Sequence, residues 1–425
     1  GEALSGQKID PQKRRAATDF TFSAPKSVSI AALVQRDERV LAAHHQAVAK
    51  AMAVLEERYA QTRIATDFGR QRLTTGNVIS AVFPHATNRE AEPQLHSHCV
   101  VMNATQLPDG RWFSFANEQA ISNKKLLGQI YQNELAIALK QQGYEIEPKA
   151  HGQFELKGYS PELLKLFSTR RQQIEALVAL WETEGKTLFS QDGRVLRSRL
   201  AMYEAAALKS RKRKPKPMHP EQLRQGWNAL SQLNEWVLPE LPEPKSVDVM
   251  RRGEDVKDVI PEEGAISSTA HTIHSASIAT HSKALIAPDI ALAIQHCSER
   301  EAVFQRTKLE RFAFEHQLGQ QSFDQLQKAI DGSTELVRID ETRVTTQAAI
   351  QSELETIRLM REGKGAVEKI ASLPQVEQQI SETLTTEQRA AITLVMTAPD
   401  AVMAWQGSAG VGKTFALNEL CKFAQ

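Results

Sequence analysis

Hydrophobic residues recur at three- and four-residue spacing between residues 37 and 60, and this period predicts an amphipathic helix. Its apolar side is formed by Leu41, Val48, Met52 and Leu55. Asp37 stands just before them, where its carboxylate can accept a hydrogen bond from an amide of the first turn. The pattern therefore predicts one long helix that begins after Asp37.

Shorter apolar or alternating runs around this helix predict strands. They cover residues 18–22, 77–84, 94–103 and 111–115, and the first ends at a turn over Ala24 and Pro25. Further helices are predicted over about 122–142, 160–184, 190–209 and 219–236. Strands and helices do not alternate regularly, which favours an α+β fold with an antiparallel sheet.

The second half of the chain has a different pattern. The segment from Val237 to Pro288 is rich in Pro, Ser, Thr and Ala and has no sustained periodicity, as is typical of a linker. Helical patterns follow: a capping box at Ser298 and Glu301, a helix over 346–362 that ends at Gly363, and a second cap at 385–388. We therefore divide the chain into a first domain (1–236), a flexible linker (237–288), a helical region (289–380) and a last unit (381–425).

Composition and charge narrow the class of protein. The chain has 425 residues, 41% hydrophobic and 24% charged, which excludes wholesale disorder. Residues 1–250 hold 34 Lys and Arg against 27 Asp and Glu, whereas residues 251–425 hold 18 against 24, so a basic half precedes an acidic half. A basic half is compatible with a polyanion partner.

Cellular location and completeness can also be predicted. No apolar run is long enough to span a bilayer, and the three cysteines lie far apart, so we expect a reduced cytoplasmic protein without membrane insertion. The chain begins at Gly1 without a methionine and ends in the opening turns of a helix. We expect it to be an internal piece of a longer protein.

The most distinctive chemistry of the first half is a set of three histidines. His96 and His98 are two residues apart in a predicted strand, so their side chains share a face. His85 ends the preceding strand, where a hairpin can bring it alongside. Three imidazoles on one side leave positions open for water or a phosphate oxygen, which predicts a divalent-metal site for hydrolysis or phosphoryl transfer.

Asp19 strengthens this interpretation, because it lies in a predicted neighbouring strand and could orient a histidine ring from behind. The alternative is a strand that carries accommodated histidines without a metal.

Two motifs next to these residues resemble a known family. Residues 20–29 (FTFSAPKSVS) and 93–98 (PQLHSH), with His85 upstream, resemble the MobF relaxases of conjugative plasmids, and residues 43–49 (AHHQAVA) are similar too. The resemblance covers about 15–235 and implies the antiparallel palm of the HUH endonucleases. It implies that His85, His96 and His98 bind Mg²⁺, Mn²⁺ or Zn²⁺, and that Asp19 supports one of these histidines.

The resemblance also implies a substrate and a reaction. In this family a tyrosine near the N-terminus attacks single-stranded DNA at a transfer origin and forms a 5′-phosphotyrosyl link, with relaxosome accessory and coupling proteins as partners. No tyrosine precedes Asp19 in this chain, and Tyr59 and Tyr131 fall on predicted helices, where packing roles are expected. We therefore expect the metal and DNA-positioning parts of a relaxase without its attacking group.

A phosphate-binding motif stands near the C-terminus. Gly407, Gly410, Gly412, Lys413 and Thr414 belong to a complete GxxxxGKT run. An apolar stretch over 401–405 is suited to a buried strand before it, and a helical pattern follows, as a P-loop requires. Lys413 would meet the β- and γ-phosphates of ATP, and Thr414 would reach Mg²⁺.

This last region resembles the start of a RecD-like helicase, in which a glutamine reads adenine. Gln388 matches that glutamine, and a simple helix cap is the equal alternative. Only eleven residues follow Thr414, so we expect a truncated α/β unit that cannot drive translocation.

Other basic and histidine-rich positions are weaker candidates. Lys26 could contact DNA or be a plain turn lysine, and the basic run from Lys209 to Lys216 could bind phosphates or be a solvated linker. His271, His274 and His281 lie in the linker without periodicity, so we do not expect a metal site there.

Three functions stay open at this point. The first is the metal-bearing relaxase part of a conjugative nuclease–helicase. The second is a noncatalytic remnant that binds single-stranded DNA and a metal. The third is a hydrolase in which the three histidines activate water.

Overall fold

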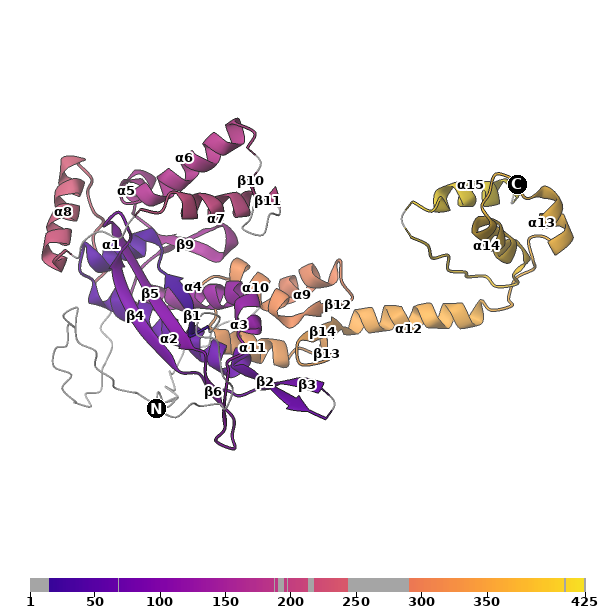
Figure 1. Ribbon diagram of the computed structural model, residues 1–425, viewed down its shortest axis with the longest axis horizontal. Coiled ribbons are helices and arrows are strands. Elements are labelled where there is room, and N and C mark those ends of the chain that lie inside the picture. The colour runs from indigo at the N-terminus through magenta and orange to yellow at the C-terminus, as the bar shows by residue number, and fades with distance from the viewer. Residues whose placement is uncertain are drawn as a thin grey trace. The chain divides into compact units, whose positions relative to one another are not determined.

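The structure is a computed structural model that describes residues 15–67, 69–186, 188–189, 195–196, 198–212, 218–243, 290–408 and 410–423. Two compact units divide the chain (Figure 1). The first takes Gly1–Ala293 and Thr307–Gly332, and the second takes Ile294–Arg306 and Ser333–Gln425. Within the described ranges, no helix has both the length and the hydrophobicity to cross a bilayer.

A three-stranded antiparallel sheet forms the centre of the first unit. Its strands are β1 (Ala17–Ser23), β4 (Ser80–Thr87) and β5 (Pro93–Met102), in the order β1-β5-β4. Buried and half-buried residues alternate along β5, as expected for a strand with one covered face. Three of the four predicted strands and the antiparallel pairing are thereby confirmed, although β4 begins at Ser80 rather than at residue 77. Of the strand predicted over 111–115, only Trp112–Phe113 forms a strand, which lies in another sheet.

Three helices supply most of the core behind this sheet. They are α1 (Lys26–Leu33), α2 (Glu38–Tyr59) and α4 (Lys124–Gln141). Fully buried side chains of this core include Val28, Ile30, Leu55, Leu95 and Ile130. The predicted cap of α2 is confirmed, because the Asp37 carboxylate accepts a hydrogen bond from the Arg39 amide at 3.0 Å.

Smaller elements complete the N-terminal part of the first unit. They are β2 (Gln61–Thr66), β3 (Gly69–Thr74), β6 (Thr105–Gln106), β7 (Trp112–Phe113), α3 (Glu118–Ser122), β8 (Ile146–Lys149), η1 (Ala150–Gly152), β9 (Gln153–Leu156), α5 (Pro161–Leu166), α6 (Thr169–Thr183), β10 (Leu188–Phe189), β11 (Val195–Leu196), α7 (Arg199–Lys209) and α8 (Pro220–Leu233). The predicted helix over 160–184 is in fact two helices, α5 and α6. The helix predicted from 190 begins only at Arg199, because Ser198 caps it through the Ala201 amide.

Two helices from beyond the linker also belong to the first unit. α10 (Arg306–His316) and α11 (Phe323–Asp331) pack on α2 and α4. The side chain of Asn133 on α4 holds the turn between α10 and α11 through two hydrogen bonds of 2.8 Å. Its Oδ1 accepts from the Gly319 amide, and its Nδ2 donates to the Gln321 carbonyl. The compact units therefore differ from the predicted division, which placed these helices in a separate region over 289–380.

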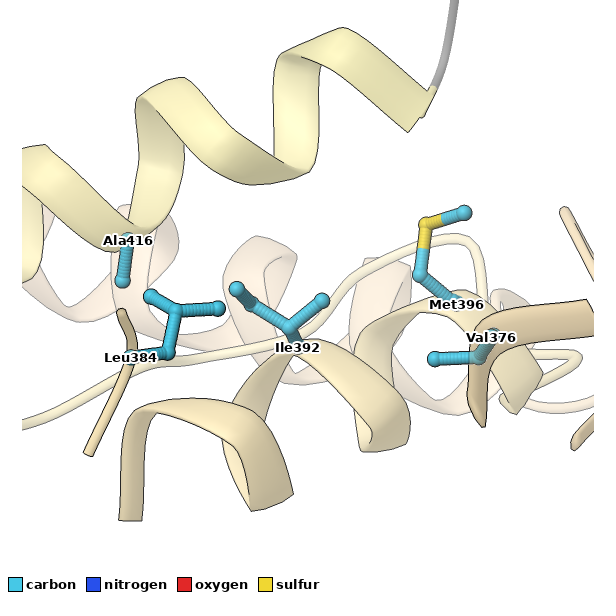
Figure 2. Packing of buried hydrophobic residues seen from close by; sticks show 5 residues of the cluster. All are labelled: Val376, Leu384, Ile392, Met396 and Ala416. Atoms are coloured by element: carbon cyan, nitrogen blue, oxygen red, sulfur yellow. The ribbon is translucent and has the colours of Figure 1, made fainter. Parts of the chain in front are cut away.

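The second unit has its own small sheet and core. β12 (Val303–Gln305), β13 (Leu336–Arg338) and β14 (Arg343–Thr346) pair in the order β12-β14-β13. Its helices are α9 (Ala291–Ser298, whose last residues belong here), α12 (Gln347–Glu362), α13 (Leu373–Gln379), α14 (Thr386–Thr397) and α15 (Lys413–Phe423). Figure 2 shows its buried cluster of Val376, Leu384, Ile392, Met396 and Ala416.

Two predictions for the second half are confirmed and two are wrong. The helix predicted over 346–362 is α12, and Thr385 forms the predicted cap, a capping box with Gln388. The box predicted at Ser298 is wrong: Ser298 is the last residue of α9, and the chain continues into β12 because Phe304 is buried in the sheet with β14. The strand predicted over 401–405 is also wrong, since these residues form no ladder with any described strand.

Candidate metal centre

The three predicted histidines meet on one face of the central sheet. His85 of β4 lies directly opposite His96 of β5, and His98 follows two residues later on the same face. One ring nitrogen from each lies within 4.8 Å of the other two, and the ring centroids are 5.0–5.3 Å apart. All three side chains are half-buried. Strand pairing thus produces the convergence that the spacing predicted.

Hydrogen bonds behind the rings fix their orientation. Asp19 Oδ2 of β1 lies 2.6 Å from Nδ1 of His98, and the Gln94 carbonyl oxygen lies 2.8 Å from Nδ1 of His96. Because each of these oxygens accepts a hydrogen bond, the neutral rings carry their proton on Nδ1 and keep the Nε2 lone pair for a ligand. Asp19 thus occupies the supporting place predicted for it, whereas the Gln94 carbonyl carries no signature in the sequence.

The donor set fits a divalent metal ion. Three neutral imidazoles suit Zn²⁺, Cu²⁺, Ni²⁺ or Fe²⁺ better than Ca²⁺, which prefers oxygen ligands. The Asp19 carboxylate, 45% exposed, adds one negative charge at the back of His98. Since all three ligands come from one side, the opposite coordination positions stay open to water or to an oxygen of a substrate.

Comparison with known proteins decides the family. The TrwC relaxase family matches residues 1–233, which is more than half of the chain. The chain belongs to the TrwC relaxase family. This confirms the resemblance to conjugative relaxases.

Individual relatives agree with this membership. The chain is 38% identical over 209 residues to "Multifunctional conjugation protein TraI" of Escherichia coli and 36% identical to the same-named protein of strain K12. Each alignment covers 47% of this chain but only 11% of the relative. A solved structure of the conjugative relaxase TrwC with oriT DNA, metal-free, is 32% identical with a TM-score of 0.48, covering 55% of this chain and 80% of that one.

Lys26, in the motif shared with the relaxases, holds the start of β5. It is the first residue of α1, and its Nζ donates to the Pro93 carbonyl at 2.8 Å. Burial lowers the pKa of Lys26 from 10.5 to about 8, although the Glu92 and Glu155 carboxylates oppose the shift. A role of Lys26 in DNA binding stays a prediction beside this structural one.

The Lys26 pKa predicts a pH-dependent stability. The unfolded chain binds more protons than the folded chain between pH 8 and pH 10.5, so this residue makes the fold more stable as the pH rises through that window. Relative to Lys26→Met, the wild-type chain is expected to gain about 1–2 kcal/mol in the free energy of unfolding between pH 7 and pH 9.5. Urea unfolding of both chains at the two pH values measures this gain, and parallel pH curves would contradict it.

The five tyrosines of the described residues make contacts of other kinds. Tyr59, Tyr131, Tyr144 and Tyr159 are all buried. The hydroxyls of the last three bond to His44, Asp37 and Gln35, respectively. Tyr203 lies on α7 between the guanidinium groups of two arginines. Each of these side chains therefore has a packing role in the described fold.

The phosphate-loop residues of the second unit lie together at the start of α15. Nζ of Lys413 donates to the Gly407 carbonyl at 2.6 Å and to the Ser408 carbonyl at 2.8 Å, so the loop carbonyls surround its ammonium group. Gly410 and Gly412 have φ values of 83° and 74°, which other residues rarely adopt. Thr414 follows Lys413 in the first turn of α15.

Gln388 joins α14 to this loop. Its Nε2 donates to the Val411 carbonyl at 3.0 Å, while its Oε1 accepts from the Thr385 amide in the capping box. A Cβ at Gly412 would approach Nε2 of Gln388 to 2.6 Å, so a larger residue there would displace the end of the Gln388 side chain. The glutamine thus both caps α14 and contacts the loop, and its reading of adenine stays a prediction.

The remaining candidates lie partly outside the described residues. Of the basic run, Lys212 pairs with Glu90 at 2.8 Å, and residues 213–217 lie outside the described ranges. His271, His274 and His281 lie outside them as well, together with most of the predicted linker.

Proposed function

We propose that the first unit is the metal-binding and DNA-positioning part of a conjugative relaxase, which acts on single-stranded DNA at a transfer origin. The observation that carries this proposal is the convergence of His85, His96 and His98 with Asp19 bonded to His98. The curated relative TraI is described as a conjugation protein, and TrwC has been solved with oriT DNA, copper-bound in one case, which supports both substrate and metal.

Each residue has a defined task in this mechanism. His85, His96 and His98 would hold a divalent ion from one side of the site. Once bound, the ion would supply Lewis-acid stabilisation of the negative charge that develops on the scissile phosphate. Asp19 keeps the His98 proton on Nδ1 and prevents the ring from turning. The half-buried position of the rings limits the water that could compete with the DNA.

The strand break itself is a transesterification. A tyrosine oxygen forms a bond to phosphorus, the bond from phosphorus to the 3′-oxygen breaks, and the leaving 3′-oxygen takes a proton. The products are a 5′-phosphotyrosyl link and a free 3′-OH, so rejoining needs no ATP. We propose that the tyrosine comes from a segment other than the described elements, because their tyrosines have packing roles.

Labelled single-stranded oligonucleotides from the transfer region beside the gene test this function. The chain is expected to bind one of them selectively without metal, and to form no cleavage product with Mn²⁺. If codons precede Gly1 in the gene, the chain extended by them is expected to form a covalent protein–DNA adduct that needs Mn²⁺ and is lost in His96→Ala.

The same experiment separates the two rival functions. Metal-dependent cleavage by the chain without any adduct would favour the water-activating hydrolase. Selective binding without an adduct in the extended chain would favour a noncatalytic remnant.

For the second unit we propose the start of an ATP-dependent helicase that is coupled to the relaxase in a longer protein. The GxxxxGKT residues at the N-terminus of α15 and the contact of Gln388 with the loop support this proposal. ATP with Mg²⁺ would be its cofactor, and relaxosome accessory and coupling proteins are the expected partners of the whole assembly.

A further inference from the structure

A buried hydrogen-bonded chain lies behind the strand that carries two of the three histidines. His44 of α2 has both ring nitrogens engaged: Nε2 lies 2.8 Å from Oγ of Ser97, and Nδ1 lies 2.8 Å from the hydroxyl of Tyr131 on α4. Ser97 is the residue of β5 between His96 and His98, and its side chain points to the opposite face of the sheet. These hydrogen bonds therefore connect α2 and α4 to Ser97, the residue between the two histidines of β5.

These three polar side chains are fully enclosed. His44 and Ser97 have no solvent exposure, and Tyr131 is 1% exposed. The Tyr131 ring packs edge-on against His44 and at a tilt of 45° against Phe22 of β1, with centroids 5.5 Å apart in each pair. Burial lowers the pKa of His44 to about 3, so the ring is neutral at physiological pH. A neutral ring has one donor and one acceptor, and both are used.

A buried network of polar side chains is unfavourable in free energy if its only role is to fill the core. Buried polar groups lose their hydration, and apolar side chains of similar volume often stabilise a fold as well or better. Hydrogen bonds give in return a fixed direction and distance, which dispersion contacts do not. A metal site needs that precision, because metal–nitrogen distances are fixed at about 2.0–2.1 Å.

We propose that His44 is a positioning residue of the metal centre, which holds β5 from its buried face so that His96 and His98 converge with His85. The inference rests on the proposed metal site. Ser97 is its point of attachment to the strand, and Tyr131 holds the His44 ring in the orientation that reaches Ser97. Asp19 and the Gln94 carbonyl orient the ligand rings on one face, while His44 fixes the backbone that carries them from the other face.

Titration of the metal-free chain with Co²⁺ tests this role through affinity and the visible spectrum of the bound ion. Ser97→Ala removes the attachment without adding bulk and is expected to lower Co²⁺ affinity about 10- to 100-fold, the range of outer-sphere substitutions. Tyr131→Phe keeps the bond to Ser97 and is expected to lower affinity less. His45→Ala is the matched control, because His45 is the exposed neighbour on α2.

Thermal unfolding of each metal-free variant separates positioning from stability. All titrations are made well below the lowest unfolding temperature, where every chain is folded. A lowered melting temperature with unchanged Co²⁺ affinity and spectrum in Ser97→Ala would overturn the proposal. His85→Ala separates a failure of the metal site from a failure of the positioning role. If His85→Ala also leaves Co²⁺ binding unchanged, the proposed metal site is wrong. If His85→Ala loses Co²⁺ binding while Ser97→Ala keeps it unchanged, only the role of His44 is refuted.

Discussion

Replacing His96 with alanine is expected to lower the affinity of the chain for Mn²⁺ by more than about a hundredfold. Substitutions of groups behind a ligand already cost about 10–100-fold, and loss of one of three protein ligands must cost more. His96 is the central residue of the site, since it lies opposite His85 and two residues from His98. Isothermal titration of the metal-free chain, or electron paramagnetic resonance of Mn²⁺, measures the loss.

A graded series makes this prediction specific. Asp19→Asn keeps a hydrogen-bond acceptor near Nδ1 of His98 but removes the charge, so we expect a smaller decrease than in His96→Ala. His45→Ala, exposed on α2, is expected to bind Mn²⁺ as the unchanged chain does. Equal affinity in His96→Ala and His45→Ala would show that the ion binds elsewhere.

Replacing Arg58 with alanine is expected to reduce the free energy of unfolding of the first unit by about 3 kcal/mol, because it removes the guanidinium that pairs with a buried carboxylate. Arg58 of α2 contacts Glu310 of α10 at 2.9 Å, and the Glu310 side chain has no solvent exposure. The Arg58 guanidinium also lies 4.8 Å from the ring centre of Phe323 and bonds to Gln327. One residue therefore links α2 to both helices from beyond the linker.

Urea unfolding followed by tryptophan fluorescence measures this effect, and Arg63→Ala is the matched control. Arg63 pairs with Glu118 at the same 2.9 Å, but both side chains are 47% exposed, so its loss should cost less than about 1 kcal/mol. The double variant Arg58→Ala/Glu310→Ala should be more stable than Arg58→Ala, because no buried charge is left unpaired. Similar losses in Arg58→Ala and Arg63→Ala would contradict the prediction.

The metal centre could be predicted from sequence because local rules determine it. Alternation along a strand places His96 and His98 on one face, and a hairpin brings His85 beside them. The supporting position of Asp19 could be predicted once its segment was assumed to form a neighbouring strand. Helix caps such as Asp37 and Thr385 were predictable for the same reason, since a cap depends on residues two or three positions away.

Other features depend on contacts between distant segments. The packing of α10 and α11 on α2 and α4 joins residues more than 180 positions apart, and no short pattern records it. The capping box at Ser298 was overridden by pairing of β12 with β14, a tertiary contact that outweighs a local preference. The apolar run over 401–405 forms no strand, because a strand needs a partner and none of the described strands provides one.

The first unit is assembled from two separate stretches of sequence, and this has a consequence for its synthesis on the ribosome. α8 ends at Leu233, whereas α10 begins only at Arg306. At about 5–20 residues per second, the ribosome needs several seconds to make the intervening stretch. During that time the faces of α2 and α4 that α10 and α11 will cover are bare, including the Arg58 side chain. The nascent chain therefore passes through a stage at which its central sheet can form but its outer helical layer is unfinished.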